Sequence, residues 1–116
     1  MRKALKISTN GTITELDLDA PEGSLRVLQG AVGGYVQAVD LTPQVTMWIN
    51  EEGKLDGLPL NFHGTMFWSA SFGIGTDEIV GDIVLTGGVD DEGETLELSA
   101  EAEEVVRSAV EMAPAI

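Results

Sequence analysis

The sequence contains no cysteine, one histidine and only six lysine and arginine residues among 116. Without cysteine, the chain has no disulfides, iron–sulfur clusters, thiolate zinc sites or cysteine nucleophile. The scarcity of basic residues disfavours direct nucleic-acid binding, which needs clustered lysine and arginine to neutralise phosphates. No run approaches the roughly 20 apolar residues of a membrane-spanning helix, and the N-terminus lacks the apolar core of a signal peptide. We therefore expect a cytoplasmic protein without membrane contacts.

Acidic residues are abundant and unevenly placed. The 20 aspartates and glutamates give a net charge of −14, and 12 of them lie in residues 77–116 beside a single base, Arg107. Because 43% of the residues are hydrophobic and are interleaved with the acids, we expect a folded chain with an acidic surface rather than disorder. A chain of this size favours one domain, residues 1–116, with one hydrophobic core.

Alternating apolar and polar residues predict strands in the N-terminal half. Residues 3–9 and 12–18 flank Asn10-Gly11, which is typical of a hairpin with a type I′ turn. Ile13 is out of phase with the other apolar residues of its run, which suggests a bulge. Residues 35–41 and 45–49 alternate in the same way, with Trp48 facing away from its two apolar neighbours.

Two further strands are predicted in the C-terminal half. Residues 78–86 are apolar at nearly every position, which favours a central strand covered on both faces. Residues 95–98 follow an acidic loop at 90–94 and are expected to add an edge strand.

Helices are predicted where apolar residues recur every three to four positions. Ser24 is a suitable N-cap for a short helix that ends at Gly33-Gly34, and Ser99 is suitable for a longer amphipathic helix. The expected buried stripes are Leu25, Leu28 and Val32 in the first helix, and Ala102, Val105, Val106, Ala109 and Val110 in the second.

Residues 50–61 are rich in turn-forming and charged residues. We expect a hairpin loop at 50–54 with Gly53 in the left-handed conformation, followed by a short strand near Lys54. Asn61 is a suitable N-cap for a helical turn at 63–69, although the aromatic residues of 62–75 fit strands equally well. Together the elements predict an α+β fold with a mixed or antiparallel sheet of about five to six strands, flanked by two or three helices.

Four motifs follow one another in the first 88 residues: VGGYV at 32–36, WINEEGKL at 48–55, GLPLN at 57–61 and IVGDIV at 79–84. This ordered series resembles an uncharacterised family of bacteria and their phages, the domain of unknown function numbered 3846. The resemblance covers residues 3–88 and implies a small α+β domain with no activity to transfer. Residues 89–116, the acidic loop and the last helix, are therefore expected to be an addition. A phage-encoded member would act in the host cytoplasm.

Catalytic and metal sites have weak support. His63 lies near Ser69 and Ser71 in the sequence, but no strand-turn-helix nucleophile motif accompanies them. The acidic run at 90–94 lacks the spacing of a calcium loop. We expect no enzymatic activity, no cofactor and no metal.

Three functional hypotheses remain. The first is a module that binds a host protein, itself basic or nucleic-acid-binding, through residues 50–61 or through the acidic C-terminal third. The second is a sponge for a small nucleotide-like signal, held by aromatic stacking and a few polar groups. The third is an acidic mimic of DNA, and each hypothesis leaves the oligomeric state open. The candidate contact residues are Arg26, Tyr35, Trp48, Asn50, Glu51, Glu52, Lys54 and Asn61.

Overall fold

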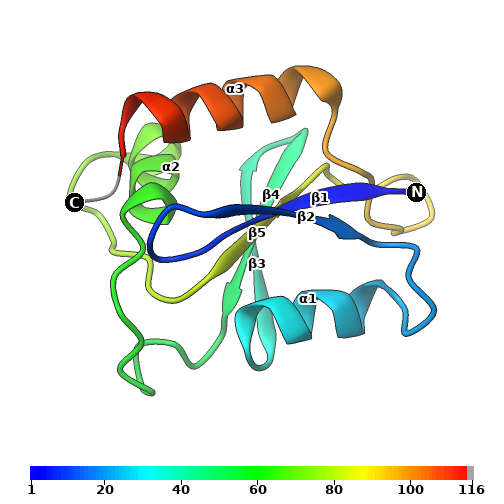
Figure 1. Cartoon of the computed structure of the whole chain (residues 1–116), viewed down its shortest axis with the longest axis horizontal. Helices are drawn as coiled ribbons and strands as arrows, with labels where there is room; N and C mark the ends of the chain where they lie inside the picture. Colours follow the sequence, from blue (N-terminus) through cyan, green and yellow to red (C-terminus); the bar gives the residue numbers. More distant parts are fainter. Residues whose placement is uncertain (115–116) are drawn as a thin grey trace.

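The computed structural model, which describes residues 1–114, contains a five-stranded antiparallel sheet in the order β2-β1-β5-β4-β3 (Figure 1). All four residues of the central strand β5 are buried. The predicted α+β class and the antiparallel sheet are thereby confirmed. The strands are β1 (Lys3–Ile7), β2 (Ile13–Asp17), β3 (Val36–Thr42), β4 (Val45–Asn50) and β5 (Ile83–Thr86).

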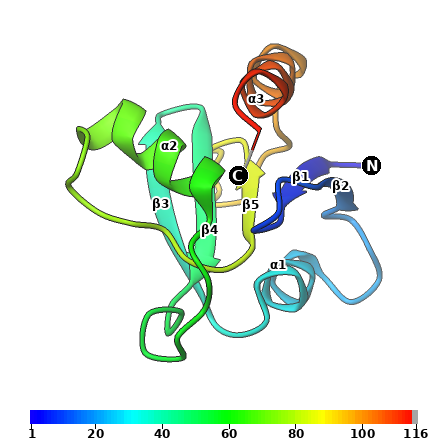
Figure 2. The same ribbon diagram turned by 60° about the vertical axis from the view of Figure 1, so that its left-hand side comes forward.

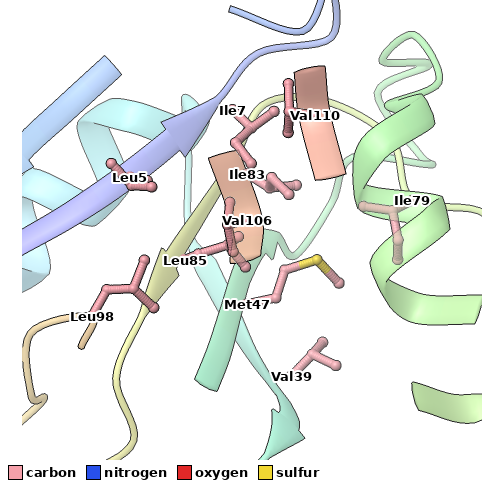
Figure 3. Packing of buried hydrophobic residues seen from close by; sticks show 10 residues of the cluster. All are labelled: Leu5, Ile7, Val39, Met47, Ile79, Ile83, Leu85, Leu98, Val106 and Val110. Atoms are coloured by element: carbon pink, nitrogen blue, oxygen red, sulfur yellow. The ribbon is translucent and has the colours of Figure 1, made fainter. Parts of the chain in front are cut away.

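Helices cover both faces of this sheet. Helix α1 (Ser24–Val32) lies on one face, and α2 (Phe62–Phe72) and α3 (Ala100–Met112) lie on the other (Figures 1 and 2). The helical alternative for residues 62–75 is therefore correct. The core beneath α1 is small, whereas the core beneath α2 and α3 is the larger one shown in Figure 3. Its buried members are Leu5, Ile7, Val39, Met47, Ile79, Ile83, Leu85, Leu98, Val106 and Val110.

The β1–β2 hairpin forms as predicted, but with a different turn. Gly11 N donates to Ser8 O at 2.9 Å, and only Gly11 has a positive φ, of 86°. A type I′ turn would need a positive φ at Asn10 as well, so that prediction was wrong. Ile13 pairs with Ile7 in an unbroken register and packs against the larger core. Ile13 therefore faces the larger core, whereas Leu16 and Leu18 face the core beneath α1. Both faces of the strand are apolar because both faces of the sheet are covered, and the strand has no bulge.

Two predicted strands are shortened or absent. The central strand begins at Ile83 and not at residue 78, because Gly81 takes a positive φ of 79° and ends the extended run. Residues 95–98 form no edge strand. Residues 88–97 instead fold back on themselves through an isolated bridge between Val89 and Thr95, after which Leu98 N donates to Lys3 O at 3.0 Å.

The helices have the predicted positions but partly different faces. Ser99 caps α3 by accepting from the amide of Ala102, whereas Ser24 is the first helical residue of α1 and Gly23 provides no side-chain cap. Leu25 is 56% exposed and Val105 is 68% exposed, so both were wrongly placed in buried stripes. Each helix buries a narrower face than its sequence suggests, since a helix on a sheet contacts it along one line only.

Asn61 joins three parts of the fold. Its side chain is completely buried and caps α2 by accepting from the Gly64 amide at 2.9 Å. Its Nδ2 donates to Ile7 O at 3.0 Å and to Gly81 O at 2.9 Å. The N-cap prediction is confirmed, and the same amide also satisfies two buried carbonyls beside the central strand.

Replacing Asn61 with alanine is expected to lower the free energy of unfolding by about 2–4 kcal/mol, because it removes a cap and leaves buried carbonyls without donors. Ser99→Ala is the matched control, since it removes only an exposed cap worth about 1 kcal/mol. Urea unfolding of both variants provides the comparison. Equal losses in the two variants would show that the two carbonyl contacts contribute nothing.

Candidate functional site

Residues 50–61 form a turn-rich loop and not the predicted hairpin with a return strand. All residues from 51 to 57 are in turns, and the positive φ belongs to Gly57, at 67°, and not to Gly53. Gly53 is buried instead, and a Cβ there would lie 3.0 Å from the Val80 side chain. The glycine is needed for close packing against the segment before β5, and the predicted strand near Lys54 does not form.

Of three candidate contact residues, Asn50 and Asn61 are buried and Trp48 is partly buried. Trp48 packs in the core beneath α1, on the opposite face from Met47 as predicted, and its Nε1 donates to Thr86 Oγ1 at 2.9 Å. Asn50 is 8% exposed and donates to Val32 O at 3.2 Å. Asn61 is completely buried. These side chains position β4, α1 and α2, and do not form a contact surface.

The other five candidates are exposed but are not gathered at one site. Tyr35, at the start of β3, is 68% exposed, and Arg26 is exposed on α1. Glu51, Glu52 and Lys54 are exposed on the 51–57 loop. The structure therefore brings only the three loop residues together.

Lys54 forms an ion pair with Asp77 that separates two hollows. The smaller, of about 170 Å³, is bordered by Glu51 and Trp68. The larger, of about 600 Å³, is bordered by Ser69 and both members of the pair. The hydrogen bond from Lys54 holds the pKa of the Asp77 carboxyl below its usual range. The pair therefore fastens the loop to the segment that leads into β5.

Most basic side chains are already neutralised. Within residues 1–114, five of the six lysines and arginines form ion pairs with carboxylates, and Arg26 is the exception. A pocket for a phosphate-bearing ligand would need free cations or amides directed into it. Five hollows in residues 1–114 each have at most one lysine or arginine in their lining.

His63 is buried at the start of α2, and its Nε2 lies 2.5 Å from the carbonyl of Ala113, just past α3. Its Nδ1 has no hydrogen-bond partner among residues 1–114. Ser69 lies six residues further along α2, which is about 9 Å along the helix axis, and Ser71 is further still. A direct hydrogen bond from either serine to His63 is therefore excluded by the geometry of the helix. The ring instead connects the beginning of α2 to the end of α3.

Residues 1–114 contain neither a cluster of metal ligands nor a membrane-spanning helix. No three histidine, aspartate or glutamate side chains are grouped closely enough to hold a metal ion in residues 1–114. No helix in that range has the length and apolar character to cross a membrane.

An apolar groove of about 530 Å³ lies between α2 and α3. Its lining comes from both helices and from the end of the β3–β4 hairpin. The principal side chains are Phe67, Ala70, Val105, Val106, Leu41 and Val45. The predicted contact residues include none of these, so the sequence-based prediction missed this feature.

A sequence signal for this surface does exist. Residues 57–76 contain no charged side chain, although the protein carries a net charge of −14. Helix α2 lies within this segment and has no charged face, whereas a helix at a protein surface normally has one. Here, however, Phe62 is 38%, Phe72 45% and Ile74 94% exposed. The uncharged segment 57–76 therefore places large apolar side chains in solvent, although Asn61 and His63 within it are buried.

A network of four charges holds α3, the other wall of the groove, on the β1–β2 hairpin. Glu103 accepts from Arg107 at 2.8 Å and lies 3.3 Å from Lys3, while Arg107 also contacts Glu15 at 2.8 Å. Hydrogen bonds from Arg107 and then Lys3 lower the pKa of Glu103. The network fixes α3 over strands β1 and β2, on the same face of the sheet as α2.

Glu103→Gln is expected to destabilise the fold at neutral pH by about 1 kcal/mol or less, as for a partly exposed ion-pair network. Because the pKa of Glu103 is lowered in the folded state, its stabilising effect is present above its ordinary value of 4.5 and is lost as the pH falls through the folded value. Denaturant unfolding between pH 7 and pH 3 should therefore show the difference from wild type shrinking. Glu104→Gln, at an exposed neighbour, is the control, and an equal effect there would contradict the network.

Lys54→Met is expected to raise the pKa of Asp77 towards its ordinary value of 3.8, because the hydrogen bond and positive charge of Lys54 are lost. Carbon-13 NMR titration of the aspartate carboxyls measures this directly. The backbone bond from the Glu78 amide should keep part of the lowering. An unchanged Asp77 titration would show that the ion pair does not persist in solution.

The chain was compared with known proteins at the level of sequence family and of structure. No curated protein and no solved structure matches it. One family model matches residues 1–110, so the match runs past residue 88 and takes in the acidic loop and most of α3. Since Val106 and Val110 of α3 also belong to the larger core, the matched region and the folded body nearly coincide. The chain belongs to the family described as Domain of unknown function (DUF3846).

Proposed function

We propose that this protein is a non-enzymatic binding protein, encoded as a phage-type accessory factor, that captures a protein of its host and so serves host takeover or counter-defence. The observation that carries the proposal is the exposed, uncharged surface of α2 in a chain with a net charge of −14. Large apolar patches on otherwise charged proteins mark interaction sites.

The composition of this surface suits a protein partner. Cores of protein interfaces are depleted in charge and enriched in aromatic residues, and buried aromatic anchors contribute much of the binding energy. The exposed rings of Phe62 and Phe72 are side chains of this kind, and Trp68 packs against Phe72 with ring centroids 4.4 Å apart and ring planes tilted by 45°. Covering apolar area contributes roughly 25 cal/mol per Å². A partner that covers α2 therefore gains affinity without needing charge.

The nucleotide-sponge hypothesis has less support. The two hollows beside Lys54, of about 170 and 600 Å³, are both bordered by Asp77 and Glu78 and by no second lysine or arginine, which disfavours an anionic ligand. Lys54 itself is paired with Asp77. The DNA-mimic hypothesis agrees with the acidic charge, but an apolar contact surface has no counterpart in DNA.

Ala70→Glu tests the proposal. Ala70 is an exposed residue of α2 that lines the groove, so the variant should fold normally yet place a charge in the contact. Affinity capture from host lysate should recover a protein with the wild-type chain and lose it with Ala70→Glu. Leu25→Glu, at an exposed apolar residue of α1 on the opposite face, is the matched control and should retain the captured protein.

Equal capture by wild type and Ala70→Glu would contradict the use of α2. The salt dependence separates this proposal from a DNA mimic, since contacts between exposed charges weaken as salt shortens the Debye length to about 8 Å at physiological ionic strength. Capture through α2 should persist at higher salt, whereas a mimic would lose its partner steeply.

A further inference from the structure

We propose that the groove between α2 and α3 is the docking site for a short amphipathic helix with basic flanks, supplied by the captured protein. This inference rests on the proposed function and adds the kind of segment that is bound. The groove is lined mainly by apolar side chains of two helices and of the sheet beneath them.

The backbone of the groove's floor favours a helix over an extended strand. Leu41 and Val45 come from β3 and β4, which pair with each other down to Thr42 and Val45, with a register shift at Leu41. Strand addition needs unpaired backbone groups at a sheet edge, and the floor presents side chains instead. A helix satisfies its own backbone hydrogen bonds and lays an apolar stripe into such a groove.

The charges around the groove select a basic partner. No lysine or arginine lines the groove, and none occurs anywhere from residue 55 to residue 106. Glu101 lines it directly, one helical turn before Val105. A lysine or arginine flanking the apolar stripe of a helix would therefore meet the Glu101 carboxylate on a protein with a net charge of −14, while acidic flanks would be repelled.

The same charges disfavour a second copy of this chain as the occupant. A symmetric dimer through the groove would bring Glu101 of one copy towards Glu101 of the other. Each copy also carries a net charge of −14, so association would meet repulsion that a basic helix does not.

The test uses two fluorescein-labelled 18-residue peptides with the same leucine stripe. One carries lysine on its polar face and the other carries glutamate. Fluorescence anisotropy with the full-length protein should show saturable binding of the lysine peptide and at least tenfold weaker binding of the glutamate peptide. Equal binding of both peptides, or binding of neither, would overturn the inference.

Two matched variants separate docking in the groove from general attraction to an acidic protein. Val105→Lys places a positive charge at an exposed groove residue, and Leu25→Lys makes the same charge change on α1. Val105→Lys should weaken the lysine peptide at least tenfold, whereas Leu25→Lys should match wild type. Equal weakening by both variants, or by neither, would show that the peptide does not occupy the groove. Circular dichroism melts confirm that both variants are folded.

The failure of this inference is distinguishable from failure of the proposed function. If Val105→Lys leaves peptide binding unchanged while Ala70→Glu abolishes protein capture, the groove is not the docking site and α2 remains the contact. If Ala70→Glu leaves capture unchanged, the proposed function itself is wrong.

Discussion

The structure depends on the burial of the central strand β5 on both faces. Its four residues, Ile83–Thr86, are completely or almost completely buried, and burying each large apolar side chain contributes about 1.5–3 kcal/mol. That contribution is available only if something covers each face of the sheet. One nine-residue helix, α1, covers the first face, and two helices are used for the second. The placement of α1, α2 and α3 follows from this requirement.

Helices α2 and α3 lie on the same face of the sheet, but different contacts hold them over different strands. Helix α3 is fixed on the β1–β2 hairpin by the buried Val106 and Val110 and by the charge network around Glu103. Helix α2 packs near β3 and is fixed at its start by the amide of Asn61 and by the contact of His63 with Ala113. The helices meet where His63 contacts Ala113, but the sheet is incompletely covered between the second half of α2 and the start of α3. The groove over the β3–β4 hairpin is the direct result.

Local patterns in the sequence were sufficient for much of the fold. The caps at Asn61 and Ser99, the left-handed end of α1 at Gly33 and the doubly covered strand around Ile83 were predictable because each depends on a few neighbouring residues. The candidate site was not predictable in this way. Asparagine is usually a surface residue, but Asn50 and Asn61 are buried. Their side-chain amides donate to carbonyls distant in the sequence, Val32 O and Ile7 O respectively. Leu25 and Val105 continue apolar stripes beyond the line along which each helix contacts the sheet.

The central claim is that the surface between α2 and α3 is left open for a partner. Hydrogen–deuterium exchange of the free protein and of its complex with the captured partner tests this most directly. We expect slower exchange in the complex in α2, in the first half of α3 and in the β3–β4 turn, with α1 and the 51–57 loop unchanged. Protection confined to α1 or to the 51–57 loop, with α2 and α3 unaffected, would contradict the account.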